Sequence, residues 1–476
     1  MATNNLRFAE GDWTQLRRIA APSFHPGAAE AGAIGLVGKF EYRGRREYLV
    51  SRMLWPQAGE VKEADNHALV FDASYIRRAH LEMRKHKLAG LAFFHSHPRA
   101  DLRVGFSDYD DFEEPKLVEN LREIESSTAV ISVVLGKRSQ CGRVWDLGRS
   151  HEALKTLIVV GEALREYPLD GSAAAASPRP SEVFSRGNVL TGAGALALLS
   201  RMTIAVIGAS GTGSLVCELL ARAGCRRILL VDFDISKTVN LNRVLHMKVA
   251  DANAGTPKVE VLKREIEALG LGCEVVCIHG NVLDRDILKQ LRDADVLFGC
   301  VDAALPRELL CRFAFQYLRP YIDVGSEIGG DEVAGIAAIN ARANYVAPGR
   351  RCLQCAGIVT SRALRHESLS AAERKRVVAQ GYSEDLLLEA PAVMDLNMHA
   401  AGYGMMLLRH ILQPVLSLPL PVTISENLLT YRTVAPDRAR AENPKCPICK
   451  ANANIGRGDC GFSLGFDAAA VKTITG

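Results

Sequence analysis

Residues 201–234 read RMTIAVIGASGTGSLVCELLARAGCRRILLVDFD, and this stretch decides the fold of the C-terminal half of the chain. An apolar run leads into a turn that holds Gly208, Gly211 and Gly213. A segment of helical period follows, and a second apolar run ends at Asp232. This order predicts a strand–helix–strand unit of a parallel sheet. Glycines let the backbone approach phosphate oxygens at the helix N-terminus, and a carboxylate after the second strand reaches ribose hydroxyls, so the stretch predicts a Rossmann-like site for NAD or ATP.

The residues downstream favour ATP over a dinucleotide. The run VDFDISKTVNLNRVLH carries Asp234, Asn240 and Arg243, and Lys258 begins a segment of helical period. An ATP whose α-phosphate is attacked needs cations for the charge that develops on pyrophosphate, whereas a dinucleotide site needs one acidic residue here. The run ADVLFGCVDA predicts a strand that leads to Asp302 at the carboxyl edge of the sheet, where the carboxylate can hold Mg²⁺. The less favoured alternative is a dehydrogenase with surface Arg and Lys side chains.

Two cysteine pairs lie further along the chain. RCLQC contains Cys352 and Cys355, and KCPIC contains Cys446 and Cys449. Paired C-x-x-C knuckles supply four thiolates in tetrahedral geometry, which closes the ion off from water. The pairs therefore predict a structural zinc site, against the alternative of four unrelated buried thiols. The helical run APAVMDLNMHAAGYGMMLLRHIL between them is predicted to be core or dimer face.

This half of the chain resembles the ThiF/MoeB superfamily, which includes the ubiquitin-activating enzymes, over nearly all of residues 182–476. The family's D-x-D-x-x-x-x-x-N-L-x-R block is matched by Asp232, Asp234, Asn240, Leu241 and Arg243, its lysine by Lys258 and its magnesium aspartate by Asp302. The resemblance implies that the domain binds ATP and Mg²⁺, adenylates a C-terminal glycine and forms a homodimer. It also implies that Arg186, in EVFSRGNVL, reaches the triphosphate, in its own subunit or in a partner subunit. Ala303 and Val244 stand where the family often has Asn and Gln, but neither departure removes a charge.

Length and composition bound the whole chain. The 476 residues are 48% hydrophobic and 24% charged, with a net charge of +4, so we expect more than one globular domain and no nucleic-acid or membrane partner. The N-terminus MATNNLRFAEGDW lacks the apolar core of a signal peptide, which predicts a cytoplasmic protein with reduced cysteines. The stretch LDGSAAAASPRPS is too poor in large apolar groups to fold alone. We therefore predict an N-terminal α/β domain at 1–165, a linker at 166–181 and an α/β domain at 182–476.

The stretch AFFHSHPRADLRVGFSDYDD, residues 92–111, carries the chemistry of the N-terminal domain. A buried strand is predicted to end near His95 and His97, whose side chains would point to the same face because they are two residues apart. Ser107 is a plausible helix N-cap with Asp110 in the first turn. Two imidazoles and a carboxylate leave one zinc position for water, as in a catalytic site. His-x-His and Ser-x-x-Asp are each weak motifs, so a polar loop before a helix is the alternative.

HSHPRADLRVGFSDYD resembles the JAMM signature of the MPN-domain (JAB-like) metalloproteases, with a slightly longer loop. The resemblance implies that His95, His97 and Asp110 hold Zn²⁺ and that Ser107 helps to hold the oxyanion. The family's upstream glutamate is matched by Glu30 in AAEAGAIGLVG, which would accept a proton from the zinc-bound water.

Some activating enzymes pass the adenylated terminus to their own cysteine on a crossover segment, here about residues 356–392. This segment contains no cysteine. Cys300 and Cys311 lie in apolar surroundings, and Cys460 has no motif to support it. The sequence leaves open whether the reaction stops at the acyl adenylate.

Together the halves resemble bacterial fusions of a JAMM peptidase with a ThiF-like domain, found with ubiquitin-like proteins and sometimes a conjugating enzyme. The resemblance implies a bifunctional enzyme that cleaves after the C-terminal glycine of a separate ubiquitin-like protein and adenylates that glycine. One alternative is activation of a sulfur carrier for thiamin, molybdopterin, cysteine or siderophore synthesis. The other is a scaffold that binds these ligands without turnover.

Overall fold

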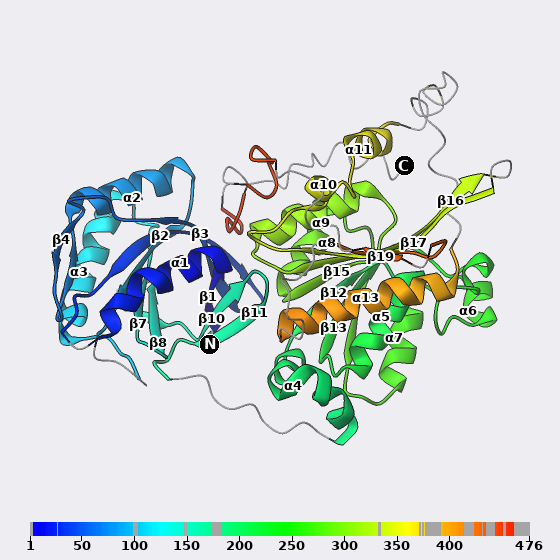
Figure 1. Cartoon of the computed structure of the whole chain (residues 1–476), viewed down its shortest axis with the longest axis horizontal. Helices are drawn as coiled ribbons and strands as arrows, with labels where there is room; N and C mark the ends of the chain where they lie inside the picture. The colour runs from blue at the N-terminus through cyan, green and yellow to red at the C-terminus, as the bar shows by residue number, and fades with distance from the viewer. Residues whose placement is uncertain are drawn as a thin grey trace. The chain divides into compact units, whose positions relative to one another are not determined.

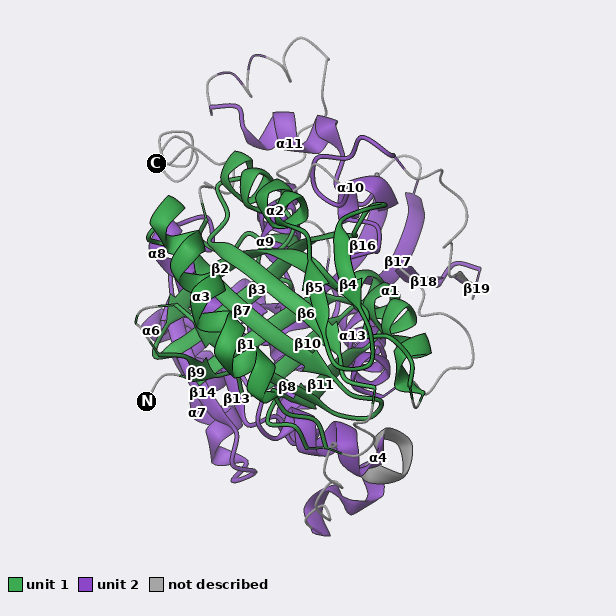
Figure 2. Ribbon diagram, turned by 90° about the vertical axis from the view of Figure 1, so that its left-hand side faces the viewer, with its two compact units in different colours: residues 1–176, 315–318, 451–463 green, residues 177–314, 319–450, 464–476 purple. Residues whose placement is uncertain are grey.

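The computed structural model divides the chain into two compact units (Figure 2). Unit 1 comprises residues 1–176, 315–318 and 451–463, and unit 2 comprises residues 177–314, 319–450 and 464–476. The residues that the structure describes are 3–25, 27–98, 103–146, 148, 150–172, 182–331, 335–370, 373, 376, 392–413, 423–430, 432–434, 443–450 and 454–460.

Unit 1 is built on a nine-stranded mixed sheet with strand order β11-β10-β1-β3-β2-β6-β7-β8-β9 (Figure 1). The strands are β1 (Thr3–Ala9), β2 (Gly32–Tyr42), β3 (Arg45–Leu54), β6 (Gly90–Ser96), β7 (Ala129–Leu135), β8 (Gln140–Trp145), β9 (Glu152–Ala153), β10 (Thr156–Val160) and β11 (Leu164–Pro168). A small hairpin pairs β4 (Val61–Ala64) with β5 (Leu69–Phe71). The helices are α1 (Glu10–Ala20), α2 (Ala73–Lys85) and α3 (Asp108–Ile124).

Alternation along β6 shows why this sheet is covered on both faces. Ala92 and Phe94 belong to one core cluster, which also contains Trp13 and Leu16 of α1. Leu91 and Phe93 belong to a second cluster with residues of α2 and α3. Successive strand side chains point to opposite faces, so the near-continuous apolar run of β6 requires helices on both sides. Unit 1 is therefore a three-layer α/β structure.

The bounds of the two compact units differ from the predicted domain bounds in two places. Strand β11 runs past residue 165, and the amide of Gly171 donates to the carbonyl of Gln140, so the N-terminal unit continues beyond the predicted boundary. Residues 451–463 fall within the predicted domain at 182–476 but belong to unit 1. Ser51 Oγ donates a 2.6 Å hydrogen bond to Ile455 O, and the amide of Asp459 donates to Lys39 O. Periodicity could not reveal this, because residues 454–460, the described part of that end, contain no helix or strand.

Unit 2 contains an eight-stranded sheet with the order β14-β13-β12-β15-β16-β17-β18-β19. The strands are β12 (Thr203–Ile207), β13 (Arg227–Asp232), β14 (Glu274–His279), β15 (Val296–Gly299), β16 (Tyr321–Asp331), β17 (Gly335–Val346), β18 (Thr423–Asn427) and β19 (Arg432–Val434). The pairs from β14 to β16 are parallel and those from β16 to β19 antiparallel.

The longer helices of unit 2 flank this sheet (Figure 1). They are α4 (Ser185–Leu199), α5 (Gly211–Arg222), α7 (Lys258–Ala268), α9 (Ala304–Gln316) and α13 (Met394–Leu412), with the shorter α6 (Val249–Ala254), α8 (Arg285–Gln290), α10 (Leu353–Ala356) and α11 (Ser361–Glu367). Helix α13 packs against α5, β16 and β17, as expected for a core helix, and leaves Met398 and Met406 exposed. Among the described residues, no helix has the length and apolarity that a membrane span requires.

Candidate functional site

The glycine turn after β12 lies in unit 2 where the sequence places it. Gly208 has a φ of +98°, which disfavours any side chain. A Cβ on Gly213 would lie 1.8 Å from the carbonyl oxygen of Gly208, and a Cβ on Gly211 would lie 2.3 Å from Nδ2 of Asn397. Gly213 therefore requires glycine because its obstacle is backbone, whereas the obstacle at Gly211 is the end of a side chain. The turn opens at the N-terminus of the 12-residue helix α5, which is the geometry that accepts phosphate oxygens.

Asp232 ends β13 beside this turn and is 8% exposed. Its Oδ2 accepts a 2.6 Å hydrogen bond from the amide of Ala209, and its Oδ1 accepts a 2.8 Å bond from the amide of Asp234. Burial raises the pKa of Asp232, and these two amide donors oppose that rise. The carboxylate therefore fixes the shape of the glycine turn, whether or not it also meets a ribose.

Lys258 begins α7 and is buried, yet its ammonium lies near the same edge. Its Nζ donates a 2.7 Å hydrogen bond to Oδ2 of Asp234. Arg243, in contrast to Lys258, makes its hydrogen bonds to residues next to it in the chain. Its guanidinium donates to Val239 O at 2.6 Å and to Oδ1 of Asn242 at 3.2 Å.

Asn240 is buried, and its Oδ1 accepts a 3.1 Å bond from the amide of Lys237. In this structure it therefore stabilises the turn that carries Arg243.

Asp302 follows β15, the strand next to β12 in the sheet. A Cβ on Gly208 would lie 2.4 Å from the carbonyl oxygen of Cys300, so the chain leading to Asp302 passes directly beside the glycine turn. Asp302 is exposed, so its carboxylate is accessible from solvent. Arg186 is also exposed, at the start of α4, and no contact within the described residues joins it to this group.

The residues that fit ATP and Mg²⁺ thus come from several separate elements but share the carboxyl edge of one sheet. Backbone amides, a buried carboxylate, a lysine and an exposed carboxylate are the groups that would hold phosphates, ribose and a divalent cation. They are Gly208, Gly211, Gly213, Asp232, Asp234, Lys258 and Asp302.

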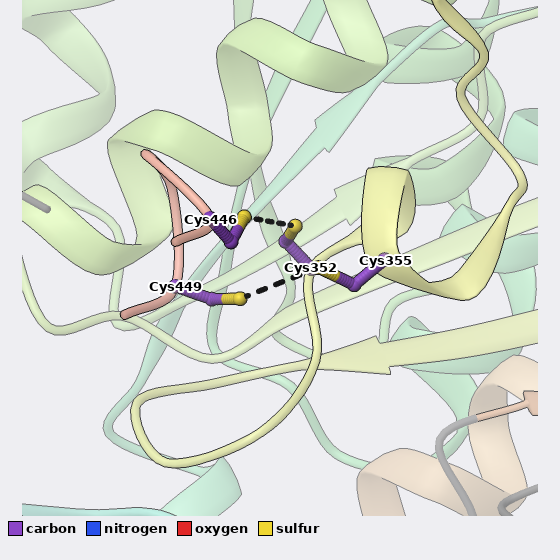
Figure 3. A group of neighbouring side chains, drawn as sticks. All are labelled: Cys352, Cys355, Cys446 and Cys449. Carbon is purple, nitrogen blue, oxygen red and sulfur yellow. Dashed lines mark hydrogen bonds between the residues drawn. The ribbon is translucent and has the colours of Figure 1, made fainter. Parts of the chain in front are cut away.

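The four predicted knuckle cysteines come together in unit 2 (Figure 3). The sulfur atoms of Cys352 and Cys446 are 3.6 Å apart, and those of Cys355 and Cys449 are 3.8 Å apart. Hydrogen bonding from the other thiols, chiefly Cys352, lowers the pKa of Cys449 to about 5. Each of these two pairs joins cysteines that are 94 residues apart in the sequence. Four converging thiols fit a structural Zn²⁺ ion.

A second candidate metal centre lies in unit 1 at the end of β6. The two Nε2 atoms of His95 and His97 are 3.2 Å apart. Asp110 Oδ1 lies 3.1 Å from Nε2 of His95, and its Oδ2 lies 3.4 Å from Nε2 of His97. Burial is the largest single effect on His95 and lowers its pKa, but the hydrogen bond to Asp110 and the nearby carboxylate charges together outweigh burial, so the pKa of His95 is raised. Two imidazole nitrogens and a carboxylate converging on one point fit a divalent cation such as Zn²⁺.

Glu30 lies next to this group and is buried. Its Oε1 is 4.0 Å from Nε2 of His97, further than Asp110 is from either ring. Burial raises the pKa of Glu30, and the two histidines oppose the rise. Asp110 therefore lies close to both rings, and Glu30 with His95 and His97 forms a group whose ligand atoms lie within 4.8 Å of one another and could also hold a metal ion.

Ser107 caps α3, as the sequence predicts, in a reciprocal capping box with Asp110. Its Oγ donates a 2.7 Å hydrogen bond to Oδ2 of Asp110 and accepts a 3.2 Å bond from the Asp110 amide. In this structure the hydroxyl therefore orients Asp110, and its predicted role at an oxyanion stays a prediction.

The structure adds residues that motif reasoning did not find. Oδ1 of Asn397, in α13, accepts a 2.7 Å bond from Ser326 Oγ while its amide contacts Gly211. Glu367 accepts bonds from the amides of Ala304 and Leu305, at the start of α9 just after Asp302. In unit 1, Ser96 Oγ accepts a 2.9 Å bond from the amide of Ala31 and so fixes the residue after Glu30. Of these residues, Asn397 could have been noticed in the sequence, because it is a polar residue in a largely apolar helical run.

Over 95 residues the chain is 41% identical to tRNA threonylcarbamoyladenosine dehydratase of Bacillus subtilis, which covers 20% of this chain and 37% of the relative. Over 217 residues it is 26% identical to adenylyltransferase and sulfurtransferase MOCS3 of Drosophila yakuba, covering 44% of this chain and 45% of the relative. The chain therefore spans less than half the length of either relative. Escherichia coli MccB with succinimide is similar in structure, with a TM-score of 0.44, 19% identity and coverage of 57% of this chain and 75% of that one.

A sequence profile of the ThiF family also matches the chain. It covers residues 186–449, more than half of the 476 residues and nearly all of the described part of unit 2. The matched range includes the glycine turn, Asp302 and all four knuckle cysteines. The chain therefore belongs to the ThiF family.

Proposed function

We propose that unit 2 uses MgATP to adenylate a carboxylate. The observation that carries this proposal is the convergence of the glycine turn, Asp232, Lys258 and Asp302 on one edge of the sheet. A dehydrogenase would need the turn and one carboxylate, but it would have no use for a buried lysine and a further exposed carboxylate there.

The proposed step is a displacement at the α-phosphorus of ATP. A carboxylate oxygen of the substrate forms a bond to that phosphorus, the bond to the β-phosphate oxygen breaks, and pyrophosphate leaves with the bonding electrons. Lys258 neutralises charge on the phosphates, and the amides of the glycine turn hold them in place. Mg²⁺ held by Asp302 would supply further positive charge to the leaving pyrophosphate.

We infer that the substrate is the C-terminal glycine of a separate ubiquitin-like protein. Among the relatives, MOCS3 is named an adenylyltransferase, and a Caenorhabditis briggsae protein with 25% identity is named ubiquitin-like modifier-activating enzyme 5. The name of the Bacillus subtilis relative points instead to a modified tRNA. Sulfur-carrier activation shares the protein substrate and differs only in its pathway.

Exchange of labelled pyrophosphate into ATP tests this proposal. We expect exchange that depends on the full chain, Mg²⁺ and a protein ending in glycine, and that bulk tRNA does not support. Stimulation by tRNA alone would transfer the proposal to the RNA substrate. Reduction of a nicotinamide cofactor without any exchange would overturn adenylation itself.

We propose a second activity for unit 1, zinc-dependent cleavage after the C-terminal glycine of a ubiquitin-like protein, as in JAMM metalloproteases of the MPN fold. The convergence of His95, His97 and Asp110 supports it, with Glu30 buried at 4.0 Å from His97. A Zn²⁺ ion there would lower the pKa of a bound water. Glu30 would accept a proton and return it to the leaving amine. The two activities would make the chain a bifunctional enzyme, and the rival scaffold would bind both ligands without turnover.

The three cysteines considered above as thioester candidates are poorly suited to that role. Burial raises the pKa of Cys300 to about 12, and burial also raises the pKa values of Cys311 and Cys460. Most of the predicted crossover segment lies outside the described residues. We therefore propose that the acyl adenylate is the product of unit 2 or is passed to an external thiol.

A further inference from the structure

A pair of arginines, one buried and one largely buried, lies beside the candidate nucleotide site of unit 2. Arg307 comes from α9 and Arg342 from β17. Both guanidinium groups flank Gly325 of β16, since a Cβ built there would lie 3.1 Å from Nη2 of Arg307 and 3.2 Å from Nη2 of Arg342. Gly325 and Arg342 are also direct partners in the β16–β17 ladder. The absence of a side chain at Gly325 therefore leaves room for both cations at one backbone position.

The buried charges of this cluster do not balance. Asp323 is fully buried, and its Oδ1 accepts a 3.1 Å bond from Nε of Arg307 and a 3.2 Å bond from the Tyr321 hydroxyl. Its other oxygen accepts a 2.8 Å bond from Asn344. Asp323 is thus committed to Arg307 and its neighbours, and one guanidinium charge remains.

That charge is on Arg342. Its side chain is 14% exposed, and the ion pair that the structure gives it is long, 3.9 Å from Nη1 to Oε2 of the 58% exposed Glu327. Its Nε is buried without a hydrogen-bond partner. Burial and the charge of Arg307 both lower the pKa of Arg342. A buried cation without close compensation destabilises a fold, so its presence indicates an anionic ligand.

The pair lies next to the position where the proposed reaction occurs. Strands β15 and β16 are parallel neighbours, with Gly299 opposite Asp323, so the chain after β15 and Gly325 lie at the same sheet edge. Nη1 of Arg307 donates a 3.2 Å hydrogen bond to the carbonyl oxygen of Asp302. An anion bound by the arginine pair would therefore lie close to Asp302, the carboxylate proposed to hold Mg²⁺. The glycine turn follows β12, which lies on the other side of β15 in the sheet.

We propose that Arg342, supported by Arg307, binds the free carboxylate of the acyl substrate before it attacks ATP. This inference rests on the proposed adenylation, because it assigns the second substrate of that site. A guanidinium fork matches the two oxygens of a carboxylate and offsets their repulsion from the phosphates. The nucleotide phosphates are the alternative ligand for the arginine pair. The glycine turn and Lys258, on the other side of β15, already supply groups that would bind those phosphates.

The test compares a carboxylate with its neutral amide on the full-length protein. The probes are N-acetylglycylglycine and N-acetylglycylglycinamide, with binding measured by calorimetry in the presence of a non-hydrolysable ATP analogue. We expect the acid to bind at least tenfold more tightly than the amide. Arg342→Gln should remove that preference, whereas Arg342→Lys should retain part of it. The exposed Arg285 on α8 provides the matched control, and Arg285→Gln should leave both affinities unchanged.

Thermal unfolding separates a binding role from a structural one. If Arg342 exists to bind an anion, Arg342→Gln should unfold at the same or a higher temperature than wild type, because it removes a poorly compensated buried charge. A structural arginine would show the reverse, and a marked loss of stability together with unchanged acid affinity would overturn the proposal.

The remaining outcomes distinguish this inference from the proposed adenylation. Two results would refute the carboxylate assignment: equal binding of acid and amide by wild type, or a loss of ATP affinity in Arg342→Gln without loss of acid affinity. In either case adenylation still stands if pyrophosphate exchange is seen. Arg342-dependent binding of the acid without any exchange, even with a glycine-ended protein, supports the carboxylate site and removes the adenylation proposal.

Discussion

Nζ of Lys258 lies 2.7 Å from Oδ2 of Asp234, and the backbone amide of Lys258 donates to the carbonyl oxygen of the same aspartate. The ammonium is buried while the carboxylate is 44% exposed. A cation proposed for the phosphates is therefore already oriented by a carboxylate that solvent, or a nucleotide, can replace. The hydrogen bond holds the lysine side chain at the sheet edge.

This pair predicts different effects for its two members. Lys258→Met should weaken ATP binding by about tenfold or more, because it removes a phosphate contact and leaves Asp234 to repel the nucleotide. Asp234→Asn should change ATP affinity by less than about threefold, since the amide still orients the lysine and the repulsion is gone. Calorimetric titration with ATP measures both. A larger loss in Asp234→Asn would mean that Asp234, not Lys258, contacts the nucleotide.

The two aspartates proposed for metal and ribose should separate chemistry from binding. Asp302→Ala should keep appreciable ATP affinity but lose about 10²-fold or more of pyrophosphate exchange with a glycine-ended partner, because an electrostatic element of the transition state is missing. Asp232→Ala should weaken ATP binding itself, since this carboxylate also holds the amides of Ala209 and Asp234. Unchanged exchange in Asp302→Ala would remove Asp302 from the mechanism.

The sequence reveals those parts of the sites that depend on local pattern. The strand, glycine turn and helix from Thr203 to Arg222, and the N-cap at Ser107, are short-range features, and the structure confirms them. The arginine pair could not be found this way. Arg307 and Arg342 are 35 positions apart on a helix and a strand, and they meet only because of the register between β16 and β17.

Tertiary packing also explains the contact of Asn397 with the glycine turn and the end of unit 1. Asn397 reaches Gly211 because α13 packs on α5, nearly two hundred residues away in sequence. Residues 454–460 contact β2 and β3 through backbone groups, and a Cβ on Gly38 would lie 2.4 Å from the carbonyl oxygens of Gly456 and Arg457. In the sequence, the one sign of this close backbone contact is Gly38, a glycine within an apolar strand.

The glycine turn makes a prediction about stability. Gly213→Ala should destabilise unit 2 by about 2 kcal/mol or more, because its Cβ would overlap a backbone oxygen that cannot move alone. Gly211→Ala should cost less, since the obstacle is the side chain of Asn397. Combining Gly211→Ala with Asn397→Ala should then recover part of the loss. Denaturant unfolding of the four proteins gives the coupling energy, and strict additivity would show that Asn397 does not restrict this turn.

Metal content should distinguish the two candidate centres. We expect about two zinc ions per chain, with mild chelation removing one first, because one centre has three protein ligands and the other four thiolates. Cys446→Ser should lose the tightly held ion and lower the unfolding temperature of unit 2. His95→Ala should lose the labile ion and leave that temperature unchanged. If the wild-type protein instead holds a single zinc ion per chain and His95→Ala holds the same amount, the cysteine cluster is the metal site and the centre in unit 1 is refuted.

The chemistry of unit 1 depends on whether Glu30 binds metal or moves a proton. Asp110 lies nearer to both imidazoles than Glu30 does, so Asp110 is expected to be the ligand and Glu30 the base. Glu30→Gln should therefore retain zinc, because the amide keeps the shape of the side chain, and should lose cleavage of a ubiquitin-like protein extended past its glycine by about 10²-fold or more. Asp110→Asn should instead lose zinc and activity together. Zinc analysis and cleavage by the same preparations separate the two roles, and the exposed Glu113 of the same helix provides the control as Glu113→Gln. Cleavage at the wild-type rate by Glu30→Gln would exclude it as the base, and loss of zinc from that variant would make it a ligand.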